Sequence, residues 1–182
     1  MTVLLSSASE VVAFWREAGP DRWFAKDDAF DRTFRAHCLP LHEAAVRGDL
    51  ASWRATPDGA LALVLLLDQF PRNCFRGTAR MFATDALARS VASAAISAGH
   101  DMAVEPFLRV FFYLPFEHSE DPDDQDRAVA LMGELDEQTR VYAELHRDII
   151  RRFGRFPHRN AVLGRKTTVE EQRFLDEGGF AG

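Results

Sequence analysis

Three stretches of the chain share one pattern, in which an apolar residue is followed by proline and then by a group of polar side chains. They cover residues 68–73, 114–120 and 155–160, and each follows a segment with apolar residues at helical spacing. In an array of antiparallel helices, segments that run the same way bring their C-terminal ends to one face. We therefore expect the polar groups of these stretches to converge on one pocket.

The side-chain types in and near these stretches indicate what such a pocket could do. A guanidinium binds a planar anion through two parallel hydrogen bonds, and an amide can orient a polar molecule. Carboxylates and imidazoles transfer protons near neutral pH. The expected ligand-binding residues are Asp68, Gln69, Arg72, Asn73, Gln125, Arg155, Arg159 and Asn160. The expected acid–base residues are Glu117, His118, His146 and His158.

The same residues also have structural interpretations. An arginine or histidine just beyond a helix C-terminus satisfies the last carbonyls, which contributes about 0.3–1 kcal/mol. Asp68 ends an apolar helix, where the dipole and desolvation oppose its charge, so it needs a cation such as Arg72 or Arg76. His146 fits a core histidine that bonds to a neighbour. The carboxylates beside His118 instead favour a raised pKa of its imidazole, which suits acid–base chemistry.

Other kinds of chemistry find little support in the residue spacing. A metal-dependent hydrolase stays an alternative, because carboxylates and imidazoles are ligand types for zinc, iron or manganese. Its ligands would come from Asp68, Glu117, His118, His146 and His158. The chain contains no H-E-x-x-H or E-x-x-H spacing, so we predict no metal ligand and no cofactor. It also contains neither a glycine-rich phosphate loop nor a G-x-S-x-G motif.

Helical periodicity runs through nearly the whole chain, and no stretch alternates as a strand does. This pattern predicts an all-α fold of seven to eight antiparallel helices with short connections. The helix predicted over 56–69 is apolar on every side in its middle, and the one over 107–114 is apolar nearly all round, so both should be central. The other predicted helices cover residues 9–18, 27–48, 84–98, 137–153 and 168–175, with one more starting at residue 121.

Prolines, caps and apolar stripes refine these helices. Pro40 predicts a kink or break, because proline lacks the N–H that the helix interior needs. Thr84 is expected to cap the helix that follows it, and Thr168-x-x-Glu171 predicts a capping box. The helix over 137–153 is amphipathic. Its expected buried stripe is Val141, Tyr142, Leu145, Ile149 and Phe153.

Length and composition predict a single domain over residues 1–182, with a frayed tail from residue 177. The net charge of −6 is unlike that of nucleic-acid-binding proteins, which need a clustered basic surface. The longest apolar run, Ala60 to Leu67, is far shorter than the roughly 20 residues of a membrane span. Two isolated cysteines fit a reducing compartment. We therefore expect a cytoplasmic protein with no nucleic-acid or membrane partner.

Several long stretches resemble the bacterial family called domain of unknown function 924. They are LLLDQFPRNCFRG at 65–77, FYLPFEHSEDPDDQ at 112–125 and HRDIIRRFGRFPHRNAVLGR at 146–165, and the opening VVAFWREAG is similar too. The resemblance covers nearly the whole chain and includes all three polar stretches. It implies a tetratricopeptide-like fold, a right-handed α-α superhelix, and it implies no activity.

Besides the metal-dependent hydrolase, two functions of different classes remain open at this point. One is a pocket that binds a small anionic or polar molecule, with or without catalysis. The other is a concave surface that takes a peptide or protein partner, as superhelical arrays do. Tryptophans exposed in a groove, from among Trp15, Trp23 and Trp53, would favour the second function. The residues alone do not decide whether the protein is an enzyme.

Overall fold

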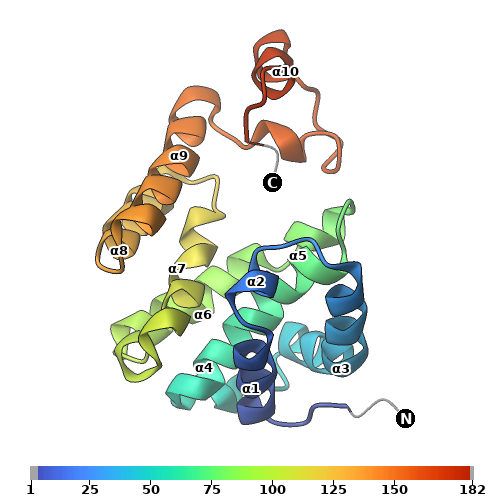
Figure 1. Ribbon diagram of the computed structural model, residues 1–182, viewed down its shortest axis with the longest axis vertical. Coiled ribbons are helices and arrows are strands. Elements are labelled where there is room, and N and C mark those ends of the chain that lie inside the picture. The colour runs from blue at the N-terminus through green and yellow to red at the C-terminus, as the bar shows by residue number, and fades with distance from the viewer. Residues whose placement is uncertain (1–3, 181–182) are drawn as a thin grey trace. The chain divides into compact units, whose positions relative to one another are not determined.

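The computed structural model describes residues 4–180 and is built from helices with short connections (Figure 1). The predicted all-α class is confirmed, and no strand occurs within the described residues. The α-helices are α1 (Ala8–Ala18), α2 (Pro20–Trp23), α3 (Asp28–Arg47), α4 (Pro57–Val64), α5 (Phe70–Cys74), α6 (Asp85–Ser97), α7 (Val110–Glu117), α8 (Pro122–Gly133), α9 (Glu137–Phe153) and α10 (Val169–Asp176). Across residues 4–180, none of these helices combines the length and apolarity that a membrane span requires.

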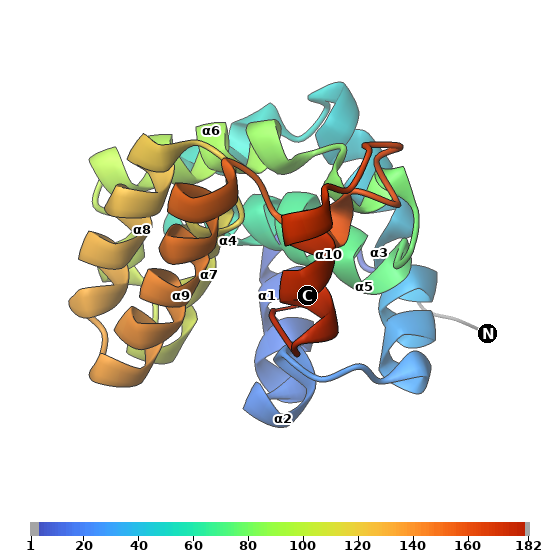
Figure 2. The ribbon, with the colours of Figure 1, turned by 90° about the horizontal axis from the view of Figure 1, so that it is seen from above.

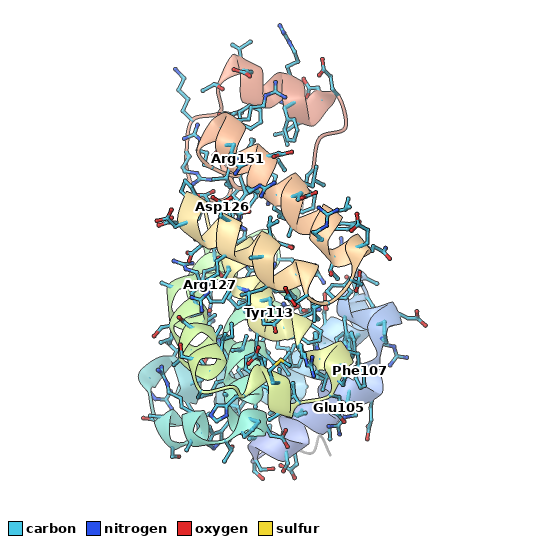
Figure 3. The ribbon with its side chains drawn as sticks, turned by 90° about the vertical axis from the view of Figure 1, so that its left-hand side faces the viewer. Glu105, Phe107, Tyr113, Asp126, Arg127 and Arg151 are labelled. Carbon is cyan, nitrogen blue, oxygen red and sulfur yellow. The ribbon has the colours of Figure 1, made fainter. Side chains whose placement is uncertain are left out.

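The chain forms two compact units. Among the described residues, the first contains 4–76 together with Arg80–Pro115, and the second contains Gly77–Ala79 together with 116–180. In the first unit, α4 packs against α1 and α6, and α3 packs against α5. In the second, α8 and α9 lie side by side (Figures 1 and 2). Arg151 of α9 donates a hydrogen bond of 3.0 Å to Asp126 of α8 (Figure 3).

The helix α4 and the turn that follows it form the centre of the first unit. Every residue from Ala60 to Leu67 is buried, as the all-round apolar pattern predicts. The Thr56 hydroxyl accepts a hydrogen bond from the backbone of Gly59 and caps α4 where predicted. The aromatic rings of Trp15 and Phe34 pack against each other nearby, with a centroid distance of 5.3 Å. Burial of each such side chain stabilises the fold by about 1.5–3 kcal/mol.

The central helix does not end at Gln69 as predicted but continues through a π-helical turn, Leu65–Gln69, into α5. In this turn the Phe70 N–H donates to the Leu65 carbonyl, five residues earlier. The wider spacing of this turn leaves one carbonyl without its usual donor, and Pro71, which has no N–H, leaves another. The buried carbonyls of Leu66 and Leu67 therefore need donors from elsewhere.

Two side chains from other helices supply those donors. The Thr84 hydroxyl donates to the Leu67 carbonyl at 2.5 Å, and His42 Nδ1 lies 2.8 Å from the Leu66 carbonyl. The prediction that Thr84 caps α6 is wrong, because its hydroxyl makes this bond and forms no cap hydrogen bond. Thr84 instead ties the start of α6 to the central helix.

Two further expectations are corrected. Of the kink or break predicted at Pro40, the break does not occur, because α3 runs from Asp28 to Arg47 with Pro40 inside it. In α9 the expected stripe is wrong for Val141, Tyr142 and Leu145, which are 51%, 55% and 45% exposed. A neighbouring stripe with the same helical spacing is buried instead. It consists of Ala143, His146, Ile149 and Ile150. Two adjacent stripes were compatible with the pattern, and tertiary packing selects between them.

Replacing Thr84 with valine tests the role of its hydroxyl. The change keeps the β-branched shape but leaves the Leu67 carbonyl buried without a donor. We expect the free energy of unfolding to fall by about 1–3 kcal/mol. Urea denaturation would measure this loss. The matched control is Thr33→Val, because Thr33 is exposed and bonds only within α3, to the Ala29 carbonyl at 2.9 Å. Equal losses in the two variants would contradict the assignment.

Candidate functional site

The first polar stretch, residues 68–73, builds a buried ionic network inside the first unit. Asp68 is fully buried, and one of its oxygens lies 3.0 Å from Arg72 while the other accepts from Gln69 at 2.7 Å. Arg72 also donates two parallel hydrogen bonds to Asp85, at 2.8 and 3.1 Å. Burial opposes the charge of Arg72, but Asp68 and Asp85 outweigh it and raise the arginine pKa. This geometry matches the structural interpretation, in which Arg72 compensates Asp68.

Asn73 belongs to a second network beside the first. Its amide donates to Asp31 of α3 at 2.7 Å, and Arg76 donates to the same carboxylate at 2.8 Å. Asp31 thereby joins α3 to α5. Sequence reasoning missed Asp31 and Asp85, because each lies in the first turn of a helix, where an acid is already explained by the dipole.

In the second unit, two predicted ligand-binding residues also hold the chain together. The Gln125 amide donates to the carbonyls of Glu117 and Ser119, both at 2.6 Å, and so satisfies the end of α7. Arg155 binds both oxygens of Glu171, at 2.6 and 2.9 Å. These bonds lower the pKa of Glu171 to about 2. The same carboxylate also completes the predicted capping box of α10.

A missed carboxylate, Glu120, fixes the third polar stretch. It accepts from Arg165 at 2.6 and 2.9 Å and from the Phe156 backbone at 2.8 Å. Burial alone would raise the pKa of Glu120, but these hydrogen bonds lower it. Arg165 also donates to the side-chain oxygen of Asn160 at 2.9 Å. No spacing rule links Glu120 to Arg165 in the sequence, because they meet only after folding.

The predicted acid–base residues meet within the second unit. The ring centroids of His146 and His158 lie 4.5 and 5.3 Å from that of Phe180. His146 Nδ1 lies 2.9 Å from the Tyr142 carbonyl and 3.6 Å from Glu117 Oε1. Because a carbonyl only accepts, Nδ1 carries the proton of the neutral ring and Nε2 carries the lone pair. Phe180 belongs to the stretch that was expected to fray, yet its ring packs between two histidines.

A buried cation completes this group. Arg159 is 7% exposed, and its guanidinium carbon lies 4.4 Å from the centroid of Phe156. Burial is the main cause that lowers the pKa of His146 and of His158 to about 4. The positive charge of Arg159 is one of the groups that contribute to both shifts. His118 is close enough to His146 to oppose its protonation. We name Glu117, His118, His146, His158 and Arg159 the histidine cluster.

The histidine cluster has the features of a polar binding site. His158 Nδ1 is buried and has no hydrogen-bond partner among residues 4–180. Both imidazoles are neutral at pH 7. His146 offers its Nε2 lone pair, because its N–H is bound to the Tyr142 carbonyl, and His158 offers its Nδ1 beside the guanidinium of Arg159. Within the described part of the chain, no three His, Cys, Asp or Glu side chains are arranged to hold one metal ion. Burial raises the pKa of Cys38 and Cys74 to about 12, which keeps both thiols protonated.

Arg72→Met separates the structural role of this arginine from a ligand-binding role. The variant leaves Asp68 buried without its cation, so we expect the free energy of unfolding to fall by about 3–5 kcal/mol. Arg151→Met is the control, because the ion pair of Arg151 with Asp126 is exposed and such pairs contribute at most about 1 kcal/mol. An Arg72→Met protein as stable as the wild type would show that Arg72 is free to serve a ligand.

The two buried imidazoles predict a loss of stability in mild acid. Their pKa falls from 6.5 in the unfolded chain to about 4 in the folded protein. Below pH 6.5 the unfolded chain therefore binds protons that the folded protein does not, and stability declines as the pH falls toward 4. Urea denaturation at pH 7 and pH 5 should show this decline, and His146→Gln should reduce it. If the imidazole NMR signals of His146 and His158 titrated near pH 6.5 in the folded protein, the prediction would be contradicted.

Comparisons with known proteins agree with this picture of an all-α protein. Residues 11–179 match the family model described as a bacterial protein of unknown function, DUF924. A solved structure of a protein of unknown function from Agrobacterium tumefaciens, ATU0120, is 56% identical. It superimposes with a TM-score of 0.92, covering 94% of this chain and 97% of that chain. No curated protein matches. The chain belongs to the bacterial DUF924 family of unknown function.

Proposed function

We propose that the histidine cluster binds a small anionic or polar molecule and that its imidazoles transfer protons to or from that molecule. The observation that carries this proposal is the position of His158 Nδ1, which is buried without a hydrogen-bond partner among the described residues. A buried polar atom without a partner costs about 1–3 kcal/mol. A bound polar group would offset that cost, and the neighbouring positive charge of Arg159 favours an anion.

Ligand binding and proton transfer would be coupled at this cluster. The charge of Arg159 opposes protonation of both imidazoles. An anion bound to Arg159 would counter that charge and raise the imidazole pKa values toward neutrality. The histidines would then be effective bases only when the site is occupied. By linkage, a protonated imidazole would also strengthen binding of the anion.

Phe180 limits access to the cluster in this proposal. Its ring contacts both imidazoles, so a ligand that reaches the rings must displace it or approach beside it. Phe180 is only partly buried and lies beyond the last helix. Displacing it is therefore less costly than displacing a core residue. Removing the ring should enlarge the site.

Inorganic phosphate is a suitable probe for the cluster. We expect phosphate to raise the melting temperature and the imidazole pKa values of the wild type, and to act more strongly on Phe180→Ala. Arg159→Gln should abolish both effects, whereas Arg151→Gln, which changes an exposed arginine on α9, should retain them. Circular dichroism would check that each variant is folded. Absence of any imidazole shift in both the wild type and Phe180→Ala would refute the proposal.

A second candidate function is a tetratricopeptide-like module that binds a peptide or protein. It is favoured by the exposed apolar side chains Val141, Tyr142 and Leu145 on one part of α9. It is not favoured by the tryptophans, since Trp15 and Trp23 are buried and the Trp23 indole donates to the Trp15 carbonyl at 2.6 Å. A stoichiometric protein partner that is lost on Leu145→Glu substitution would support this function over phosphate binding.

A further inference from the structure

A hollow in the first unit is separate from the histidine cluster and lies beside the C-terminal half of α3. It has a volume of about 280 Å³ and is bordered by His42, Glu43, Val46 and Arg47 of α3 and by Arg80, Ala83 and Thr84. All of these side chains except Val46 and Ala83 carry hydrogen-bonding groups. The hollow therefore combines donors and acceptors in a space large enough for a small metabolite.

His42 presents an acceptor to this hollow. Its Nδ1 must be protonated, because it lies 2.8 Å from the Leu66 carbonyl, which only accepts. The ring is fixed further by Phe70, which stacks on it with a centroid distance of 4.8 Å. Burial lowers the pKa of His42, so the ring is neutral and Nε2 keeps its lone pair. Among the described residues, no group donates to Nε2.

Arg80 presents donors on the facing side. Its guanidinium carbon lies 3.9 Å from the centroid of Phe75, which holds the planar group in place. Its contact with Glu43 is a single one of 3.4 Å between two half-exposed side chains. Such a pair contributes about 0–1 kcal/mol. The other guanidinium nitrogens of Arg80 make no hydrogen bond to the described residues and can bind a carboxylate.

A smaller apolar hollow adjoins the first. It has a volume of about 130 Å³ and shares Val46 and Arg47 with its neighbour. Part of its wall consists of aliphatic side chains of the central helix and α6, namely Leu63, Leu67, Leu87 and Val91. The rest comes from residues 45–54 and includes Arg47 and Arg54. A ligand with a polar head in the first hollow could therefore place an apolar side chain in the second.

We propose that these adjoining hollows bind a free α-amino acid with an aliphatic side chain. In this arrangement the carboxylate binds to Arg80, and the ammonium group donates to Glu43 and to His42 Nε2. The side chain lies in the apolar hollow. Glu43 and Arg80 share only one half-exposed contact of 3.4 Å, so each can exchange it for a charged group of the ligand. A carboxylate alone would satisfy Arg80 but not the His42 lone pair, and an amine alone would satisfy Glu43 but not Arg80. The opposite charges of Glu43 and Arg80 therefore favour a zwitterion.

The test uses L-leucine as the probe with three analogues that each lack one part. 4-Methylpentanoate lacks the ammonium group, 3-methylbutylamine lacks the carboxylate, and glycine lacks the side chain. Calorimetry and the imidazole ¹⁵N signal of His42 would report binding. We expect millimolar or tighter affinity for leucine and at least about tenfold weaker binding for each analogue, equivalent to about 1.4 kcal/mol per lost part.

Variants connect the binding to the named side chains. Arg80→Gln should abolish leucine binding, and Glu43→Gln should weaken it; both residues are half-exposed, so the fold should persist. Ala83→Leu should also block binding by filling the hollow that Ala83 helps to line. The matched control is Arg32→Gln, which changes an exposed arginine on α3, the helix that carries Glu43. This variant should bind leucine like the wild type. An unchanged His42 signal at millimolar leucine, equal binding of all analogues, or equal losses in Arg32→Gln and Arg80→Gln would overturn the proposal.

Discussion

The first unit depends on two buried carbonyls, those of Leu66 and Leu67, that lack their usual donors. Pro71 has no N–H and lies where a fully buried helix passes through a π-helical turn, so both carbonyls must find donors outside the helix. Thr84 and His42 provide them. The same requirement attaches α3 and the start of α6 to the central helix, and it fixes which nitrogen of His42 is protonated.

Most of the predicted arginines are paired with carboxylates, and the histidine cluster is different. In the first unit, Asp68, Arg72 and Asp85 satisfy one another, so their charges need no further partner to be stable there. In the second unit, Arg155 and Arg165 are bound to carboxylates in the same way. The histidine cluster differs from these networks, because its imidazoles are kept neutral by burial and one buried nitrogen has no partner among residues 4–180. That difference favours binding at the cluster, which includes Arg159, over binding at Arg72 or Arg155, which the sequence also suggested.

Sequence reasoning identified groups of residues better than it identified their partners. The acid–base set of Glu117, His118, His146 and His158 was chosen from polar stretches and one helical stripe, and these residues meet in the second unit. Of the carboxylates that bind the predicted arginines, only Asp68 was expected, as a partner of Arg72. Asp85 and Glu171 each had a sufficient local explanation, as a first-turn acid and a capping-box acid. A residue can satisfy a local rule and a distant partner at once, and only the local rule is visible in a sequence.

The amino-acid sequence by itself determined the all-α class, the apolar central helix, and the caps at Thr56 and Thr168, because these features depend on contacts within a few residues. Tertiary structure decided which of two stripes α9 buries and which carbonyl binds the Thr84 hydroxyl. It also decided that Phe180 packs against two histidines. These outcomes depend on groups that are far apart along the chain and become neighbours only when helices pack, so no periodicity or spacing within one segment can encode them.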